Sequence, residues 1–214
     1  MPVVDGLAIL DGTVMPASEA RLPVTDDGLL RGDGVFEVIR IYAGRPFALD
    51  EHLARMQASA ARLRLPLDLA AIRTDVDALL AAAAPGDAKL RLLVTRGGRR
   101  IALIESLGDF SLPLALATVE FAPVRILDGV KSLSYAANML ATRIAQEEGA
   151  DEALLITPHG RVLEAPTSAF FCVLDGELVT PPLSDHILDS ITRRHVLQLA
   201  EVTERPVARA GSRR

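Results

Sequence analysis

Cysteine is nearly absent from this sequence of 214 residues, and its one thiol, Cys172, lies in the apolar run 169–174. A single cysteine excludes an intramolecular disulfide and a zinc site built from several thiolates. In such a run it is typical of a small buried hydrophobic residue. Because no metal-ligand spacing relates the histidines, we assign no metal to His52, His159, His186 or His195.

The sequence also has no apolar run near the roughly 18 residues that cross a membrane, and no basic-then-apolar signal segment at its start. Its net charge of −5 comes from interspersed charges of both signs, which leaves no footprint for nucleic acid or an anionic membrane. Hydrophobic residues make up 50%, which is typical of a folded globular chain. We therefore expect a cytoplasmic protein that acts on small molecules.

Hairpin strands and helices are expected in the first half. Asp11-Gly12 between apolar residues predicts a hairpin within residues 3–14. From Val35 to Tyr42, Val/Glu/Ile/Ile alternate with Phe/Val/Arg/Tyr, which predicts a strand. An apolar stripe with acidic residues in its first turn predicts a helix carried by Leu49, Leu53, Met56, Ala60 and Leu63. We expect a second helix at about 69–83 and strands at 89–95, 101–105 and 114–121.

In the second half, residues 121–130 are interpreted as a loop with a short strand at a domain junction. A hairpin is expected across Asp175-Gly176, and further elements are a helix at 135–148, a strand at 152–157 and a helix at 191–199. The layout is α+β with strands in hairpins, in an N-terminal domain of residues 1–122 and a C-terminal domain of residues 123–214. A Rossmann fold is excluded because Gly32-Asp33-Gly34 has no third glycine and no following helix.

Lysine is also scarce in this sequence. Of the 23 basic residues that are lysine or arginine, only Lys89 and Lys131 are lysines. An arginine cannot lose its proton at neutral pH, whereas a buried lysine can, and its neutral amine attacks a carbonyl to form a Schiff base. Pyridoxal phosphate chemistry uses such a lysine. It also needs a phosphate anchor, an acid beside the pyridine nitrogen and a substrate pocket.

Segments in a fixed order over nearly the whole chain match this chemistry. They are residues 32–40 (GDGVFEVIR), 51–56 (EHLARM), 131–135 (KSLSY), 151–153 (DEA), 164–168 (EAPTS) and 187–193 (ILDSITR). Together they resemble the class IV pyridoxal-phosphate aminotransferases, which include branched-chain and D-amino-acid aminotransferases and aminodeoxychorismate lyase. The resemblance implies a two-domain enzyme of fold type IV, a bound pyridoxal 5'-phosphate and a homodimer.

By this resemblance Lys131 forms the Schiff base and moves the proton between the substrate α-carbon and the cofactor. Glu164 is similar to the carboxylate that keeps the pyridine nitrogen protonated, and its distance of 33 residues from Lys131 matches the family. Taken without the other segments, Lys131 would fit an exposed lysine at a strand end, and Glu164 a solvated strand carboxylate.

Other cofactor contacts follow from the same resemblance. Arg55 is similar to the phosphate-binding arginine, although it also fits an arginine at the edge of the apolar stripe. Ser190 stands where the family usually has glycine and opens a helix whose N–H groups fit a phosphate or a plain N-cap. Ala169 stands where many members have asparagine. The remaining candidate contacts are Tyr135, Thr167, Ser168, Ile191 and Thr192.

Candidates for the substrate side are Phe36, Arg40, Tyr135, Arg96 and Arg100, because a substrate carboxylate needs a cation or backbone donors. The turn from Arg96 to Arg100 fits a solvated loop nearly as well.

Family members usually continue beyond Pro206-Val207, whereas this sequence ends in a polar tail, so we expect an incomplete second domain with weakened cofactor retention. The expected activity is amino transfer between an amino acid, branched-chain or similar, and a 2-oxo acid. One alternative is aminodeoxychorismate lyase, which forms 4-aminobenzoate and pyruvate. The alternative from another class is a non-catalytic remnant.

Overall fold

The structure, a computed structural model, describes residues 6–108 and 112–208. Contacts divide the chain into two units, and each is described by itself. Unit 1 consists of Met1–Asp109 and Val130–Ser134, and unit 2 of Phe110–Gly129 and Tyr135–Arg214. Unit 1 thus includes a short segment from beyond the expected junction. The domain limits of 1–122 and 123–214 stay a prediction, and the tail after residue 208 lies outside the described residues.

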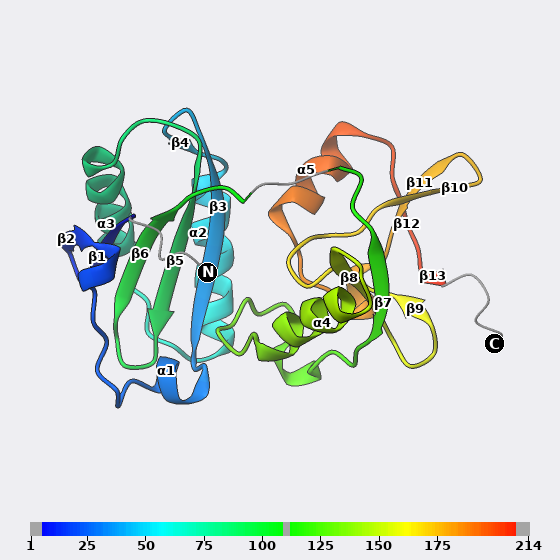
Figure 1. Cartoon of the computed structure of the whole chain (residues 1–214), viewed down its shortest axis with the longest axis horizontal. Coiled ribbons are helices and arrows are strands. Elements are labelled where there is room, and N and C mark those ends of the chain that lie inside the picture. Colours follow the sequence, from blue (N-terminus) through cyan, green and yellow to red (C-terminus); the bar gives the residue numbers. More distant parts are fainter. Residues whose placement is uncertain (1–5, 109–111, 209–214) are drawn as a thin grey trace. The chain divides into compact units, whose positions relative to one another are not determined.

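Unit 1 contains a six-stranded antiparallel sheet in the order β2-β1-β6-β5-β3-β4 (Figure 1). Its strands are β1 (Leu7–Leu10), β2 (Thr13–Pro16), β3 (Gly34–Tyr42), β4 (Arg45–Pro46), β5 (Ala88–Thr95) and β6 (Arg100–Glu105). Its helices are α1 (Asp27–Arg31), α2 (Leu49–Arg62) and α3 (Leu69–Ala82). The predicted hairpin at Asp11-Gly12 and both long helices are confirmed.

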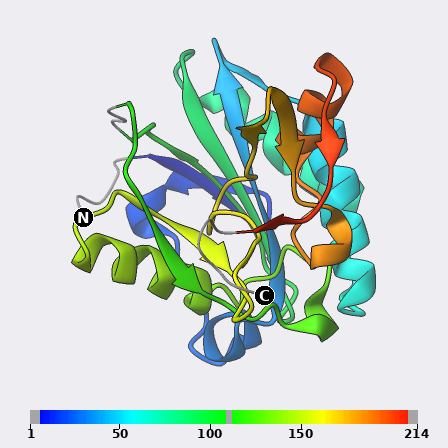
Figure 2. The same ribbon diagram turned by 90° about the vertical axis from the view of Figure 1, so that its right-hand side faces the viewer.

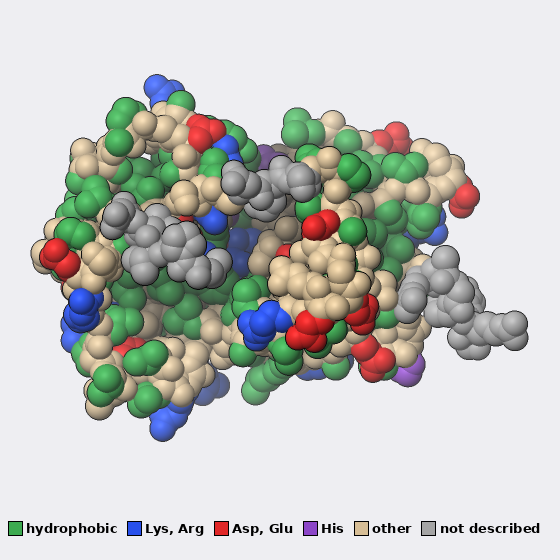
Figure 3. Space-filling model, viewed as in Figure 1, with side chains coloured by type: hydrophobic (Ala, Val, Ile, Leu, Met, Phe, Trp, Pro, Cys, Tyr) green, Lys and Arg blue, Asp and Glu red, His purple; other side chains and the backbone are tan. Residues whose placement is uncertain are grey.

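One face of this sheet packs against α2 and α3. Alternate residues of β3 point to that face, so Val35 and Ile39 are completely buried, and they meet Met56 of α2 and Val76 of α3 in the core. The predicted stripe of α2 is therefore the buried stripe. On the opposite face, hydrophobic side chains lie over the strands of unit 1 (Figure 3).

Unit 2 holds a four-stranded sheet in the order β13-β9-β8-β7 and a three-stranded sheet in the order β10-β11-β12. Its strands are β7 (Leu116–Glu120), β8 (Glu152–Ile156), β9 (Arg161–Val162), β10 (Cys172–Leu174), β11 (Glu177–Thr180), β12 (Thr203–Glu204) and β13 (Val207–Ala208). Helix α4 (Ala136–Glu147) lies along β7 and β8 (Figure 2), and α5 (Ile191–Leu199) follows later. The hairpin across Asp175-Gly176 and the helix at 191–199 are confirmed.

One expectation for unit 2 is wrong. The strand expected within residues 121–130 is replaced by a 3-10 turn, Arg125–Leu127, because no partner strand is placed beside it among the described residues. Strands β7 and β8 pair in parallel. Parallel neighbours need a crossover connection, and α4 supplies it by packing Ala141 and Ala145 against this sheet.

No helix in the described ranges is both long and apolar enough to cross a membrane.

Candidate active site

Lys131 is held at the edge of the unit 1 sheet by hydrogen bonds on both sides of its backbone. Its N–H donates to the Ser59 hydroxyl of α2 at 3.1 Å, and its carbonyl accepts from the Phe36 N–H of β3 at 3.1 Å. The next residue, Ser132, forms an isolated antiparallel bridge with Val35. Lys131 was expected at a strand end, and the structure places it beside this bridge, outside any strand.

The Lys131 side chain lies over an aromatic ring. Its Nζ is 4.4 Å from the centre of the Phe36 ring, and residues 131 and 36 stand opposite each other on the same face of the pairing. An ammonium ion is attracted to the face of such a ring. Lys131 is half-buried, and Phe36 is buried. Phe36, expected on the substrate side, is therefore a direct neighbour of the lysine.

Behind this pairing lies a buried charge cluster of Glu37, Arg55 and His52. Arg55 donates to Glu37 through two atoms, with Nε to Oε1 at 2.8 Å and Nη2 to Oε2 at 2.5 Å. His52 Nδ1 lies 2.8 Å from Glu37 Oε2. Burial alone would raise the pKa of Glu37, but the hydrogen bonds from Arg55 and His52 outweigh it and lower the pKa below 4.5. Glu37 is thus a carboxylate at neutral pH.

The sequence predicted Arg55 either as the phosphate-binding arginine or as an arginine at the edge of the apolar stripe, and the structure shows it buried and bound to the Glu37 carboxylate through two atoms. Phosphate binding by Arg55 stays a prediction. Sequence reasoning missed the roles of Glu37, His52 and Ser59. The signal for Glu37 was present, because the alternation of β3 puts it on the same face as Val35 and Ile39. A carboxylate on an apolar face needs a cation opposite it.

Glu164 of unit 2 follows β9 and is anchored by main-chain groups. Its Oε1 accepts the N–H of Leu188 at 3.0 Å, and its own carbonyl accepts from Leu155 of β8 at 2.9 Å. The side chain is half-buried. Two strands and the segment that leads into α5 therefore fix the direction of this carboxylate.

Tyr135, which precedes α4, helps to fix the loop that carries Thr167 and Ser168. Its hydroxyl donates to the Pro166 carbonyl, and Asn138 Nδ2 donates to the same oxygen at 3.2 Å. Thr167 and Ser168 follow this anchor and expose their side chains to solvent. The structure therefore brings three of the predicted cofactor residues into one local arrangement.

The start of α5 has the geometry of an anion-binding helix terminus. Ser190 is its N-cap, and the hydroxyl accepts from the Arg193 N–H at 3.3 Å, as the capping alternative predicts. The N–H groups of Ile191 and Thr192 belong to the first turn, where no intrahelical acceptor exists. Ile191 is buried and Thr192 is exposed. The cap and an anion are compatible, since the cap uses another N–H group.

The arginines expected at the substrate are tied to carboxylates within unit 1. Arg96 pairs with Asp33 at 3.0 Å and also donates to the carbonyls of Leu63 and Arg64. Its hydrogen bond to Asp33 raises its pKa above the usual range. Arg40 pairs with Asp87 at 2.7 Å. The Arg96 loop is thus bound to the fold and is not a freely solvated turn.

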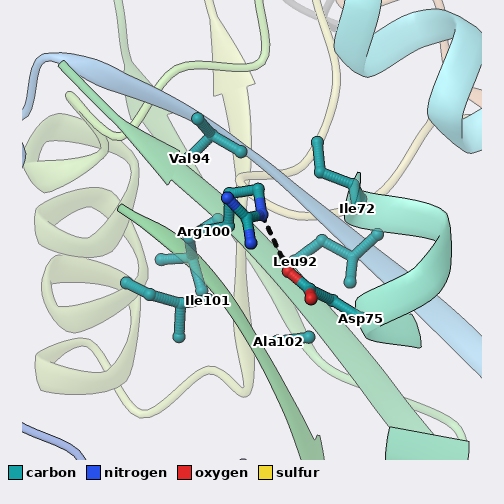
Figure 4. Close-up of a pocket in the computed structure, with 8 residues that line it drawn as sticks. Ile72, Asp75, Leu92, Val94, Arg100, Ile101 and Ala102 are labelled. Atoms are coloured by element: carbon teal, nitrogen blue, oxygen red, sulfur yellow. Dashed lines mark hydrogen bonds and ion pairs between the residues drawn. The ribbon is translucent and has the colours of Figure 1, made fainter. Parts of the chain in front are cut away.

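Arg100 points from the start of β6 to Asp75 of α3 (Figure 4), with Nε 2.9 Å from Oδ2. The pair borders a cavity of about 10 Å³, close to the space of one water, among apolar residues of α3 and the sheet. The bond to Asp75 raises the pKa of Arg100. The structure thus places Arg100 on the helix-facing side of the sheet, opposite to the face that carries Phe36 and Lys131.

Unit 1 has a lysine held beside an aromatic ring, and unit 2, taken by itself, has an anchored carboxylate and a helix N-terminus. Groups of these three kinds are used by pyridoxal-phosphate enzymes. The model of the family described as amino-transferase class IV matches residues 34–210, and the chain belongs to this family.

Relatives and solved structures support the same assignment. The putative branched-chain-amino-acid aminotransferase of Methanocaldococcus jannaschii is 36% identical, over 92% of this chain and 77% of the relative. The fold IV transaminase of Curtobacterium pusillum is 30% identical with a TM-score of 0.86, over 95% of this chain and 83% of that chain. The 4-amino-4-deoxychorismate lyase of Pseudomonas aeruginosa is 32% identical with a TM-score of 0.79, over 95% and 83%. The expected α+β fold of type IV is confirmed.

The residues present fit pyridoxal phosphate, the cofactor that the family implies. An amine is available at Lys131, and an oriented carboxylate at Glu164. The first turn of α5 offers N–H groups that suit a phosphate, since helix N-termini favour anions. Each chemical group of the cofactor therefore has a candidate partner.

Proposed function

We propose that this enzyme moves an amino group between an amino acid and a 2-oxo acid, with Lys131 as its catalytic residue. The observation that carries the proposal is the placement of Lys131. One of only two lysines in the chain has its backbone tied to both α2 and β3 and its amine over Phe36. Lysine side chains are usually exposed, whereas this one is half-buried with its amine over an aromatic ring, which supports a function for it.

Pyridoxal phosphate, when bound, supplies an aldehyde that condenses with amines and a pyridinium ring that withdraws electrons from the substrate α-carbon. In the proposal, Lys131 Nζ is the nucleophile toward the aldehyde, and it later carries the proton to and from the α-carbon. The Glu164 carboxylate holds the proton on the pyridine nitrogen. The Leu188 N–H donates to one of its oxygens, and a carboxylate held in this way supports the assignment.

The phosphate is assigned to Arg55 and to the N–H groups of Ile191 and Thr192, with the Thr192 hydroxyl as a further donor. Hydroxyls of Tyr135, Thr167 and Ser168 complete the proposed cofactor contacts. The bond from Tyr135 to Pro166 ties these contacts together, since it fixes the loop that carries the other two.

We assign a branched-chain or similar amino acid as the substrate. Support comes from the relative of that name and from Phe36, whose ring gives an apolar surface next to Lys131. Arg40 is the candidate for the substrate carboxylate. Arg96 and Arg100 are further candidates, and all three arginines are paired with a carboxylate of unit 1 that a substrate would have to displace or share. By analogy with the family we also propose a homodimer, which sedimentation of the purified protein would test.

A second candidate function, aminodeoxychorismate lyase, is favoured by the similarity to the solved lyase of Pseudomonas aeruginosa. Both activities use the same lysine and differ in the product: a transaminase passes the amino group of its substrate to a 2-oxo acid, whereas the lyase expels pyruvate and leaves 4-aminobenzoate. Product analysis separates them: we expect amino transfer that requires an added 2-oxo acid. Release of 4-aminobenzoate and pyruvate from aminodeoxychorismate without an oxo acid would overturn the transaminase assignment.

The cofactor and the catalytic lysine are tested together by borohydride reduction in the presence of pyridoxal phosphate, followed by peptide mapping. We expect a stable label on Lys131. Lys131→Ala should lose both the label and the turnover. Lys89→Ala is the matched control, since Lys89 is the other lysine, and it should keep both. A wild-type protein with no label on Lys131 and no turnover would instead support the non-catalytic remnant.

A further inference from the structure

Glu37 is completely buried on the helix-facing side of β3, where its neighbours along the strand, Val35 and Ile39, are core residues. A carboxylate in this position is unfavourable unless cations and hydrogen bonds compensate for its lost hydration. It therefore calls for an explanation beyond packing, because an apolar residue would fill the same space without partners.

Glu37 binds Arg55 in a way that fixes the plane of the guanidinium. The two hydrogen bonds, at 2.8 and 2.5 Å, join Nε and Nη2 to the two different carboxylate oxygens. This is the parallel, bidentate geometry of an arginine fork. This contact engages two of the guanidinium nitrogens and so sets the direction in which the whole planar group lies.

His52 and Ser59 place this arrangement next to Lys131. His52, Arg55 and Ser59 are three and four residues apart and lie on one face of α2. His52 contacts Glu37, while Ser59 receives the N–H of Lys131. Along the helix axis, the backbone of Arg55 is about 6 Å from that of Ser59. One helix face therefore carries both the fork and the anchor of the catalytic lysine.

We propose that Glu37 is a positioning residue, which holds the Arg55 guanidinium in the orientation that binds the phosphate of the cofactor. The inference rests on the proposed function and deepens it. Arginine has a long side chain with considerable rotational freedom, and a fixed fork loses less of that freedom when it binds an oxyanion. Glu37 touches neither cofactor nor substrate in this proposal and acts only through Arg55.

A purely structural role for Glu37 makes a different prediction. If the cluster only stabilises unit 1, its loss weakens every ligand of this unit alike. If Glu37 positions Arg55, its loss weakens only ligands that carry a phosphate. Pyridoxal and pyridoxal 5'-phosphate share the aldehyde and the ring and differ in this one group, so the ratio of their dissociation constants isolates the contribution of the phosphate.

The experiment measures both dissociation constants by absorbance titration for the wild-type protein, Glu37→Gln, Arg55→Lys and Asp75→Asn. We expect the preference for the phosphorylated form to fall about tenfold or more in Glu37→Gln and in Arg55→Lys, since each loses the charged fork. Asp75→Asn, which removes the carboxylate of a different arginine pair in the same unit, should keep the wild-type preference.

A Glu37→Gln protein with the wild-type ratio would overturn the proposal, whether both affinities fall together or neither changes. If Glu37→Gln does not fold, Glu37→Asp is the second variant, because it keeps the charge but moves the carboxylate one methylene away from Arg55. An unchanged ratio of the two dissociation constants in Glu37→Asp would also overturn the proposal. Failure of the proposed function is distinguishable, because the wild-type protein would then show no borohydride-stable label on Lys131 at all.

Discussion

Two arginine–carboxylate pairs lie on the helix-facing side of the same sheet, and they differ in burial and in the number of bonds. In the pair of Glu37 and Arg55, the side chains are 0% and 8% exposed, and His52 adds a third partner. In the pair of Asp75 and Arg100, the arginine side chain is 27% exposed and donates one hydrogen bond to the carboxylate. The first pair is isolated from water, while the second can be hydrated from one side.

The difference shows which ion pair the fold depends on. Water can solvate Arg100, which is 27% exposed, after its partner Asp75 is lost, but it cannot reach the Glu37 carboxylate, which is 0% exposed. We therefore expect the pair of Glu37 and Arg55 to resist substitution more strongly than the pair of Asp75 and Arg100. A protein keeps a demanding pair of the first kind where it fixes a geometry, which agrees with the role proposed for Glu37.

The largest expected effect is on the free energy of unfolding of Glu37→Gln. Removing this charge leaves Arg55 and His52 buried without their carboxylate, and the loss should be about 3–5 kcal/mol. For Asp75→Asn we expect about 1–2 kcal/mol, because water can solvate Arg100. Chemical denaturation of both variants checks the order, and equal losses would remove the distinction between the two pairs.

A smaller effect is expected in the pH dependence of the Glu37 contribution. Because the pKa of Glu37 is lowered in the folded state, its stabilisation is fully present above about 4.5, the ordinary pKa, and is lost as the pH falls through the lowered pKa. The stability difference between wild type and Glu37→Gln should be greatest near neutral pH and shrink below 4.5. Denaturation series at several pH values measure it. A constant difference down to strongly acidic pH would contradict the charged state of Glu37.

The smallest effect is expected for Asp87→Asn. Asp87 pairs with Arg40 on the surface, where its side chain is 51% exposed. Its pKa is lowered chiefly by the N–H of Ala43 and then by Arg40, but solvent screens this attraction. The melting temperature should be indistinguishable from that of the wild type. A clear drop would show that the exposed pair matters as much as the buried ones.

Local patterns predicted much of the fold. The alternation of β3, the stripe of α2 and the cap before α5 are properties of neighbouring residues, and the structure confirms all three. The short helix α1 was missed because only its ends carry a signal, the Asp26 cap and the left-handed Gly32. The need for glycine at position 34 could not be predicted from neighbouring residues, because it comes from a distant strand: a Cβ at this position would lie 2.5 Å from the Val94 carbonyl oxygen.

In the candidate site, too, some features could be predicted from the sequence, while others depend on residues that are far apart in the chain. Lys131 and Glu164 were predicted as site residues from the resemblance to the family, because the segments that carry them and their spacing of 33 residues are distinctive, and their roles stay predictions. The partner of Arg55 was not identified, because Glu37 lies 18 residues away and approaches it only when α2 packs on the sheet. Ser59 was missed for the same reason, since its hydroxyl meets a peptide group 72 residues later in the chain.

The attachment of Lys131 to β3 also concerns how the protein reaches its native state. Gly34 and Leu133 are joined by a backbone hydrogen bond across about one hundred residues of intervening chain. Contacts of such long sequence separation require the closure of a large loop and tend to slow folding. A nascent chain that ends before residue 130 can contain all six strands of its first sheet and still lack Lys131, the proposed nucleophile. Lys131 is therefore a late addition to unit 1 during synthesis.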